Sequence, residues 1–290
     1  MGYAGSEETA VTTAIEPREH TVETRGLRFH YTEWGSREAP AVVCLHGLSA
    51  MCRIWDPLAR ALQDRYRVLA LDQRGHGDTS WPAEPDYRTD DYVADLEALV
   101  EHWGIDRCVL IGLSMGGMNS IAYTARNPGR VTHLVPVDIP PAVDPSRRPN
   151  RDLDRQVAEG GHNSFADLDA AYLARKLTHP HTSGEAMRHH VRHLMKQGPD
   201  GRVVPKQDPR VSYHWQPSDL WEELPKVSVP VLIVRGGQSQ VLPEKTAGRM
   251  RDAFPNAELL TIEEAGHTVP EDAPSRFIAA VRDFLARNPS

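Results

Sequence analysis

A serine between small residues is the clearest sign of chemistry in this sequence. Gly112, Ser114 and Gly116 follow an apolar run and precede a helical pattern. The spacing G-x-S-x-G is typical of a strand that turns sharply into a helix and presents a nucleophilic serine at the turn. Side chains at positions 112 and 116 would collide with such a turn. The pattern therefore predicts Ser114 as a nucleophile, the alternative being a glycine-rich turn with an incidental serine.

A second motif could supply the hydrogen-bond donors that acyl transfer needs. His46 and Gly47 follow another apolar run, and a loop at this point can bring the backbone N–H of Leu48 beside the serine. Together with the N–H of Met115, it would form an oxyanion hole for a tetrahedral intermediate. His46 itself is expected to hold the loop rather than to carry a proton.

The general base is predicted at His267. Gly266 and His267 lie in a loop after the last apolar run, and the histidine follows Ser114 in chain order, as the base does in hydrolases with this serine turn. The chain has 14 histidines, most of which are expected to be polar surface. The loop context distinguishes His267 from the others.

These residues need a scaffold, and the chain predicts one by alternating short β-branched runs with helical patterns. The predicted strands are residues 20–24, 27–34, 41–45, 67–71, 108–112, 132–137, 231–235 and 258–262. The predicted helices are residues 55–64, 89–103, 115–127, 243–254 and 274–287. Alternation of this kind indicates an α/β fold, here a mostly parallel eight-stranded sheet flanked by helices, with the first two strands as an antiparallel edge.

The alternation stops between residues 139 and 224. This stretch is rich in arginine, histidine, proline and aspartate, and it contains helical fragments at 165–177 and 184–196. We expect an inserted helical lid over one end of the sheet. The predicted organisation is a disordered leader at 1–18, a hydrolase core at 19–138 and 225–290, and the lid at 139–224.

Taken together, the motifs resemble one family. His46-Gly47, the turn Asp72–Asp78, Gly112–Gly117 and Gly266-His267 are similar to those of the α/β-hydrolase superfamily, and more narrowly to its cofactor-free esterases and carbon–carbon bond hydrolases. The resemblance covers residues 20–139 and 220–288. It implies a catalytic triad, an acyl-enzyme on the serine, and neither a metal nor an organic cofactor. Members with an aspartate nucleophile are disfavoured by the serine at position 114.

The acid of the triad departs from the family pattern. Related hydrolases carry an aspartate after the strand that follows the lid, and here Gln240 stands at that position. A glutamine can orient an imidazole but cannot stabilise an imidazolium. Asp138, at the end of the preceding strand, is the favoured replacement, because neighbouring parallel strands end at the same edge of a sheet. Glu244 and an incomplete triad remain as alternatives.

Three functions fit these residues. The first is hydrolysis of a small carboxylic ester or lactone, and the second is hydrolysis of a carbon–carbon bond in a diketone-like substrate, which would need lid arginines such as Arg188 or Arg192 to bind a carboxylate. The third is a catalytically impaired hydrolase fold that binds a ligand. His189 and His193 are spaced to share a metal on one helix face, but a solvated face is the favoured interpretation.

The composition of the chain limits the kinds of binding partner that we expect. The net charge of −7 argues against nucleic acid and anionic membranes as partners and leaves a small molecule. Three cysteines without framework spacing indicate a reducing, cytoplasmic location. Cys44 and Cys108 are expected in the core, and Cys52 near the surface. Nothing in the sequence indicates an oligomeric state.

Overall fold

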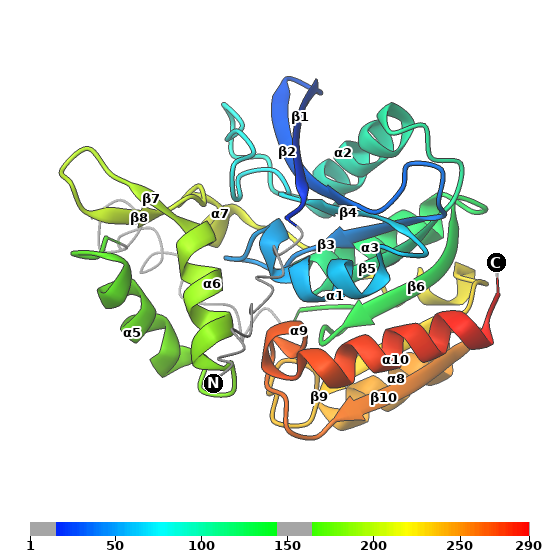
Figure 1. The fold of residues 1–290 in the computed structure, drawn as a ribbon. Coiled ribbons are helices and arrows are strands. Elements are labelled where there is room, and N and C mark those ends of the chain that lie inside the picture. Colours follow the sequence, from blue (N-terminus) through cyan, green and yellow to red (C-terminus); the bar gives the residue numbers. More distant parts are fainter. Residues whose placement is uncertain (1–15, 144–163, 290) are drawn as a thin grey trace, which may run out of the picture.

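Eight strands form one sheet in the computed structural model, which describes residues 16–143 and 164–289. The strand order is β1-β2-β4-β3-β5-β6-β9-β10. β1 and β2 form an antiparallel edge, β2 pairs antiparallel with β4, and the remaining pairs are parallel. The strands are β1 Arg18–Thr24, β2 Leu27–Trp34, β3 Ala41–Leu45, β4 Arg67–Leu71, β5 Cys108–Leu113, β6 Val131–Val137, β9 Val231–Gly236 and β10 Ala257–Ile262. The predicted fold class is confirmed (Figure 1).

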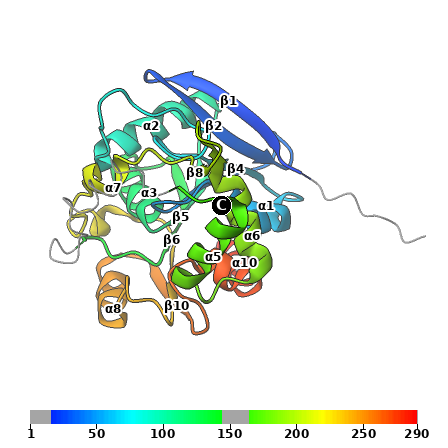
Figure 2. The same ribbon diagram turned by 90° about the vertical axis from the view of Figure 1, so that its left-hand side faces the viewer.

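The central strands are apolar throughout because helices cover both faces of the sheet. In β3, Val42 and Cys44 pack into a core shared with α1 and α10, whereas Val43 and Leu45 pack into a second core shared with α2, α3 and α8. Figures 1 and 2 show these layers. The helices are α1 Asp56–Leu62, α2 Thr89–His102, α3 Met115–Arg126, α8 Glu244–Ala253 and α10 Pro274–Arg287.

The predicted ends of these helices all lie within two residues of the observed ends. The largest difference is at α1, where the observed helix is shorter than the predicted one at 55–64. Its start is set by a 3-10 turn, η1 (Cys52–Trp55), which precedes it, and by Pro57, which lies in the first turn of α1. Proline is favoured in a first helical turn and therefore marks the start.

A segment inserted between β6 and β9 lies at the carboxyl ends of the parallel strands (Figures 1 and 2). It contains α5 Leu168–Thr178, α6 Gly184–Leu194, the hairpin β7 Met195–Gln197 and β8 Val203–Pro205, α7 Val211–His214, and the 3-10 turn η3 Leu224–Lys226. The predicted second helical fragment was too long, since the backbone becomes extended at Met195 and enters the hairpin. Residues 1–15 of the predicted leader and 144–163 of the predicted lid lie outside the described residues.

The cysteines are free and buried. This agrees with the expectation for Cys44 and Cys108, but the expected exposure of Cys52 is wrong, because Asp72 binds its backbone N–H and draws it inward. Over residues 16–143 and 164–289, no helix combines the length and the apolar character that a membrane crossing needs.

The close approach of α3 to β3 generates a stability prediction. A Cβ at Gly116 would lie 2.3 Å from the backbone oxygen of Leu45. We expect Gly116→Ala to lower the free energy of unfolding by about 2–3 kcal/mol or more, because the rigid backbone cannot move aside. Urea denaturation measures this change.

The matched control is Gly248→Ala in α8, where nothing lies within 4 Å of the added Cβ. Alanine is the better helix former by about 1 kcal/mol, so this variant should be as stable as the parent or more so. Equal destabilisation by both substitutions would contradict the packing argument.

Candidate active site

Ser114 lies at a strained turn between β5 and α3. Its backbone has φ 53° and ψ −120°, a conformation that costs a non-glycine residue free energy and that clusters at functional sites. Its N–H donates to the carbonyl oxygen of Val137 at 2.9 Å, which ties the turn to the end of β6. Ser114 is partly exposed, although Leu113 and Met115 on either side are buried. The strand-turn-helix context predicted from the glycine spacing is present.

The loop after β3 lies against this turn. A Cβ at Gly47 would be 3.1 Å from the Cβ of Ser114, so a larger residue here would crowd the serine. Leu48 follows directly, on the same loop as predicted for one oxyanion donor. Met115 is the first residue of α3, where backbone N–H groups have no acceptor within the helix.

His46 holds this loop as a neutral side chain. Its Nε2 accepts the backbone N–H of Gln73 at 3.0 Å, so its proton is on Nδ1, which donates to the carbonyl of Gly47 at 2.8 Å. Burial lowers the pKa of His46, which favours the neutral ring. Gln73 also donates to the His46 carbonyl and accepts from Asn119 of α3. The loop and the helix of Ser114 are thereby connected through one amide.

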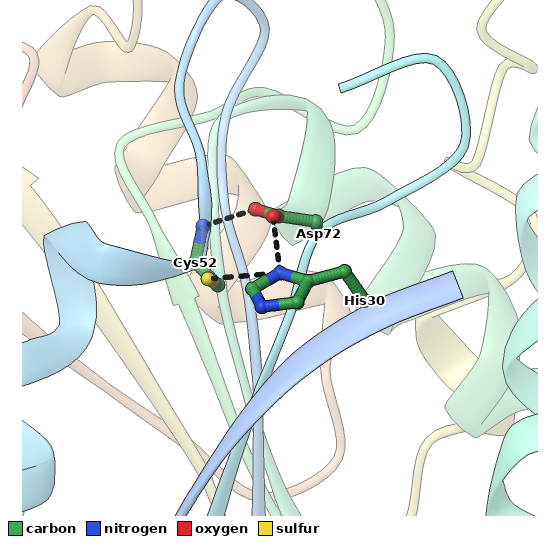
Figure 3. A group of neighbouring side chains, drawn as sticks. All are labelled: His30, Cys52 and Asp72. Atoms are coloured by element: carbon green, nitrogen blue, oxygen red, sulfur yellow. Dashed lines mark hydrogen bonds and ion pairs between the residues drawn. The ribbon is translucent and has the colours of Figure 1, made fainter. Parts of the chain in front are cut away.

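A buried cluster of His30, Cys52 and Asp72 anchors the other end of the loop (Figure 3). Asp72 accepts the backbone N–H of Cys52 at 2.7 Å and the Nδ1–H of His30 at 2.7 Å. Burial alone would raise the pKa of Asp72, but its hydrogen bond to His30 lowers it to about 2. Burial alone would lower the pKa of His30, but hydrogen bonds to Asp72 and Glu19 raise it to about 9. The cluster is a protonated, ion-paired anchor.

The same cluster has the ligand types of a metal site, since one atom from each of His30, Cys52 and Asp72 lies within 4.8 Å of the others. A metal would have to displace the proton shared by His30 and Asp72, and burial raises the pKa of the Cys52 thiol well above its usual range. These residues therefore fit a hydrogen-bonded anchor better than a metal centre. The rings of His189 and His193, the pair considered from sequence, lie 4.6 Å apart, and His189 contacts Asp56.

Asp138 is a buried carboxylate at the end of β6. Its backbone has φ 47°, a left-handed conformation that aspartate tolerates better than most residues. Its Oδ1 accepts the N–H of Gly236 at 2.9 Å, and its Oδ2 accepts the Ser239 hydroxyl and the Nδ1–H of His267, the latter at 2.7 Å. Three donors from two other segments therefore converge on this side chain.

His267 is held by the end of the neighbouring strand. A Cβ at Gly236 would lie 2.0 Å from the carbonyl oxygen of Gly266, so the loop of the histidine packs directly against β9. Asp272, in the short helix α9 (Val269–Asp272), accepts the N–H of Gly266 at 3.0 Å. The His267 side chain is 34% exposed. The imidazole is therefore oriented by the bond from its Nδ1 to Asp138, and another part of the ring is accessible.

The residue at the usual acid position does not contact Asp138, but its neighbour does. Gln240 and Glu244 are exposed, whereas the neighbouring Ser239 is buried and donates its hydroxyl to Asp138. The Ser239 oxygen also accepts the N–H of Val241 at 3.1 Å. Sequence reasoning missed Ser239, although its place one residue before the absent acid was a usable signal.

Comparison with known proteins identifies the family. Residues 40–274 match the family model of the alpha/beta hydrolase fold. The chain therefore belongs to the α/β-hydrolase family, and the resemblance noted from the motifs is confirmed. Hydrolysis is the activity that this family and the relatives below support.

Two curated proteins and one solved structure illustrate the similarity. The chain is 30% identical to mouse sn-1-specific diacylglycerol lipase ABHD11, over 87% of this chain and 83% of that protein. It is 28% identical to N-formylmaleamate deformylase of Pseudomonas putida, over 91% and 95% respectively. The crystal structure of E-2-(acetamidomethylene)succinate hydrolase superposes with a TM-score of 0.84 at 25% identity, covering 93% of this chain and 100% of that one.

The ion-paired anchor predicts a pH-dependent stability. The pKa of His30 is about 9 in the fold against an ordinary 6.5, so its proton stabilises the fold fully below pH 6.5, and this contribution is lost as the pH rises through 9. At about 1.4 kcal/mol per pKa unit, the loss is at most about 3 kcal/mol. His30→Gln should flatten the fall in unfolding free energy between these pH values, as measured by urea titrations.

Exposed His102, at the end of α2, is the matched control. His102→Gln should keep the pH dependence of the parent. If His30→Gln also keeps it, the protonated anchor is ruled out.

Proposed function

We propose that the protein is a serine hydrolase that cleaves a small carboxylic ester or lactone through an acyl-enzyme on Ser114. The observation that carries this proposal is the 2.7 Å hydrogen bond between His267 Nδ1 and Asp138 Oδ2. An ionised aspartate only accepts hydrogen bonds, so the imidazole proton is on Nδ1 and Nε2 keeps its lone pair. That is the tautomer a general base for a serine hydroxyl needs.

The residues have the following roles in this mechanism. His267 removes the hydroxyl proton of Ser114 as the oxygen attacks the substrate carbonyl, and Asp138 stabilises the imidazolium that forms. The backbone N–H groups of Leu48 and Met115 bind the oxyanion. His267 then protonates the leaving alcohol, and a water molecule activated by the same histidine releases the acyl group. No metal or organic cofactor takes part.

The Asp138 contact also bears on the alternative of an impaired, ligand-binding fold. That alternative rests on Gln240 at the usual acid position, and Gln240 is exposed. A carboxylate from the neighbouring strand supplies the charge that the glutamine lacks, which favours an active enzyme. Carbon–carbon bond hydrolysis would use the same residues, and no contact in the described ranges favours it over ester hydrolysis.

The names of the relatives support hydrolysis of an acyl group, and two of the three indicate a small substrate. One is a diacylglycerol lipase, one an N-formylmaleamate deformylase and one a 2-(acetamidomethylene)succinate hydrolase. We further propose that the lid predicted at residues 139–224 shapes the substrate pocket, since its described part lies at the carboxyl ends of the strands (Figure 1). Three buried free thiols suit a cytoplasmic location.

The proposed triad predicts that substitutions of Asp138 and of Gln240 have very different effects on kcat. With short-chain p-nitrophenyl esters, Asp138→Asn should lower kcat by on the order of 10²–10⁴, because the imidazolium loses its counter-charge and the histidine its tautomer. Gln240→Ala should change kcat less than threefold. Ser114→Ala sets the background rate.

Equal melting temperatures of the variants would show that the losses are catalytic. Comparable losses from Asp138→Asn and Gln240→Ala, or no loss from Asp138→Asn, would reject Asp138 as the acid.

A further inference from the structure

A cavity of about 310 Å³ lies between the inserted segment and the loop after β3. At about 30 Å³ per water molecule, it has room for a small ligand. Arg175 of α5 and Lys196 of β7 line this cavity. The described residues of its lining include no aspartate or glutamate. The lining is therefore cationic, although the chain as a whole carries a net charge of −7.

Arg175 is a half-buried arginine whose guanidinium has no direct carboxylate partner among the described residues. Its Nη2 donates to the carbonyl oxygen of Ser49 at 3.0 Å and to His190 Nε2 at 2.9 Å. Its Nε is buried and has no hydrogen-bond partner in the described ranges. Burial lowers the pKa of Arg175, with the charge of Glu271 opposing the effect. A buried donor left without an acceptor destabilises the fold.

The nearest acidic group reaches Arg175 only through a histidine. His190 accepts from Arg175 at Nε2, so its proton is on Nδ1, which donates to Glu271 at 2.8 Å. Glu271 is thus already used by His190 and does not neutralise the guanidinium by direct contact. The relay orients Arg175, whose side chain is among those that line the cavity.

This cation is close to the proposed reaction centre. Ser49, which binds Arg175, follows Leu48, the proposed oxyanion donor, and consecutive Cα atoms are about 3.8 Å apart. Gly47, one residue earlier, packs against Ser114. A group bound by Arg175 would therefore lie beside the loop that carries the proposed oxyanion donor.

The lid arginines suggested from sequence lie elsewhere. Arg188 pairs with exposed Asp169 at 3.0 Å, and its guanidinium stacks over Tyr172 at 4.3 Å from the ring centre. Arg188 and Arg192 line a different hollow, together with Asp167 and Asp169. Carboxylates next to both arginines make that hollow a poor site for an anion.

We propose that Arg175, assisted by Lys196, binds a carboxylate group of the substrate in this cavity. The preferred substrates are then esters whose acyl part carries a free carboxylate a few bonds from the reacting carbonyl. This inference rests on the proposed function for the reaction, but the binding of the anion does not depend on it.

The first test compares monoethyl glutarate with ethyl 5-methylhexanoate, in which an isopropyl group replaces the carboxylate. We expect the parent enzyme to prefer the half-ester at least tenfold in kcat/KM, followed by pH-stat. Arg175→Gln should lower kcat/KM for the half-ester at least tenfold and for the neutral ester less than threefold. A role of Arg175 in holding the Ser49 loop alone would lower both equally, and that result would overturn the proposal.

Arg188→Gln is the matched control, since it removes an exposed arginine from the same segment and should keep the preference. Lys196→Ala, at an exposed position, should reduce the preference by a smaller factor and serves as the second variant if Arg175→Gln does not fold. Absence of any preference in the parent, or loss of the preference in Arg188→Gln, would contradict the assignment.

A binding measurement separates this inference from the proposed function. Calorimetric titration of glutarate into Ser114→Ala should show binding that weakens at least tenfold when Arg175→Gln is added. If the parent hydrolyses neither ester but glutarate still binds through Arg175, the proposed function is wrong and the anion subsite stands. If the parent hydrolyses esters and glutarate does not bind, the subsite is wrong and the proposed function stands.

Discussion

A buried carboxylate must be satisfied by hydrogen bonds, and Asp138 meets this requirement by joining three segments of the chain. Its own strand, β6, brings it to the edge of the sheet. Gly236 at the end of β9, Ser239 after it and His267 after β10 supply the donors. Removing a charge of this kind from water is costly unless it is fully paired. The loop of His267 and the end of β9 are therefore held in one arrangement, and the orientation of the imidazole follows from it.

The Ser114 side of the site depends on how closely the backbone of the loop after β3 approaches that of α3. Gly47 and Gly116 let the loop after β3 and the start of α3 come together without side chains between them, and Gly112 lets β5 approach α3. His46, Gln73 and the anchor at Asp72 then fix the loop through hydrogen bonds. The result is a serine at a strained turn, with Leu48, whose N–H we propose as an oxyanion donor, on the adjacent loop. Rigid positioning of this kind is what electrostatic stabilisation of an oxyanion requires.

Local signals made much of this predictable from the sequence. Apolar strands bounded by turn residues located the sheet to within two residues, and G-x-S-x-G located the strained turn at Ser114. Asp138 could be put forward because parallel strands end at a common edge. Ser239 was missed although it stands one residue before Gln240, because its role depends on which way a loop side chain turns. Arg175 was missed for the same reason: its place in a helical pattern says nothing about burial, and exposed Arg188 looked equivalent.

The most direct test of Ser114 as the nucleophile is a crystal structure of the protein after reaction with a fluorophosphonate. We predict phosphorus bonded to Ser114 Oγ, with the phosphoryl oxygen about 2.7–3.1 Å from the N–H groups of Leu48 and Met115, and His267 still bonded to Asp138. An unmodified Ser114, or a phosphoryl oxygen turned away from both N–H groups, would contradict it.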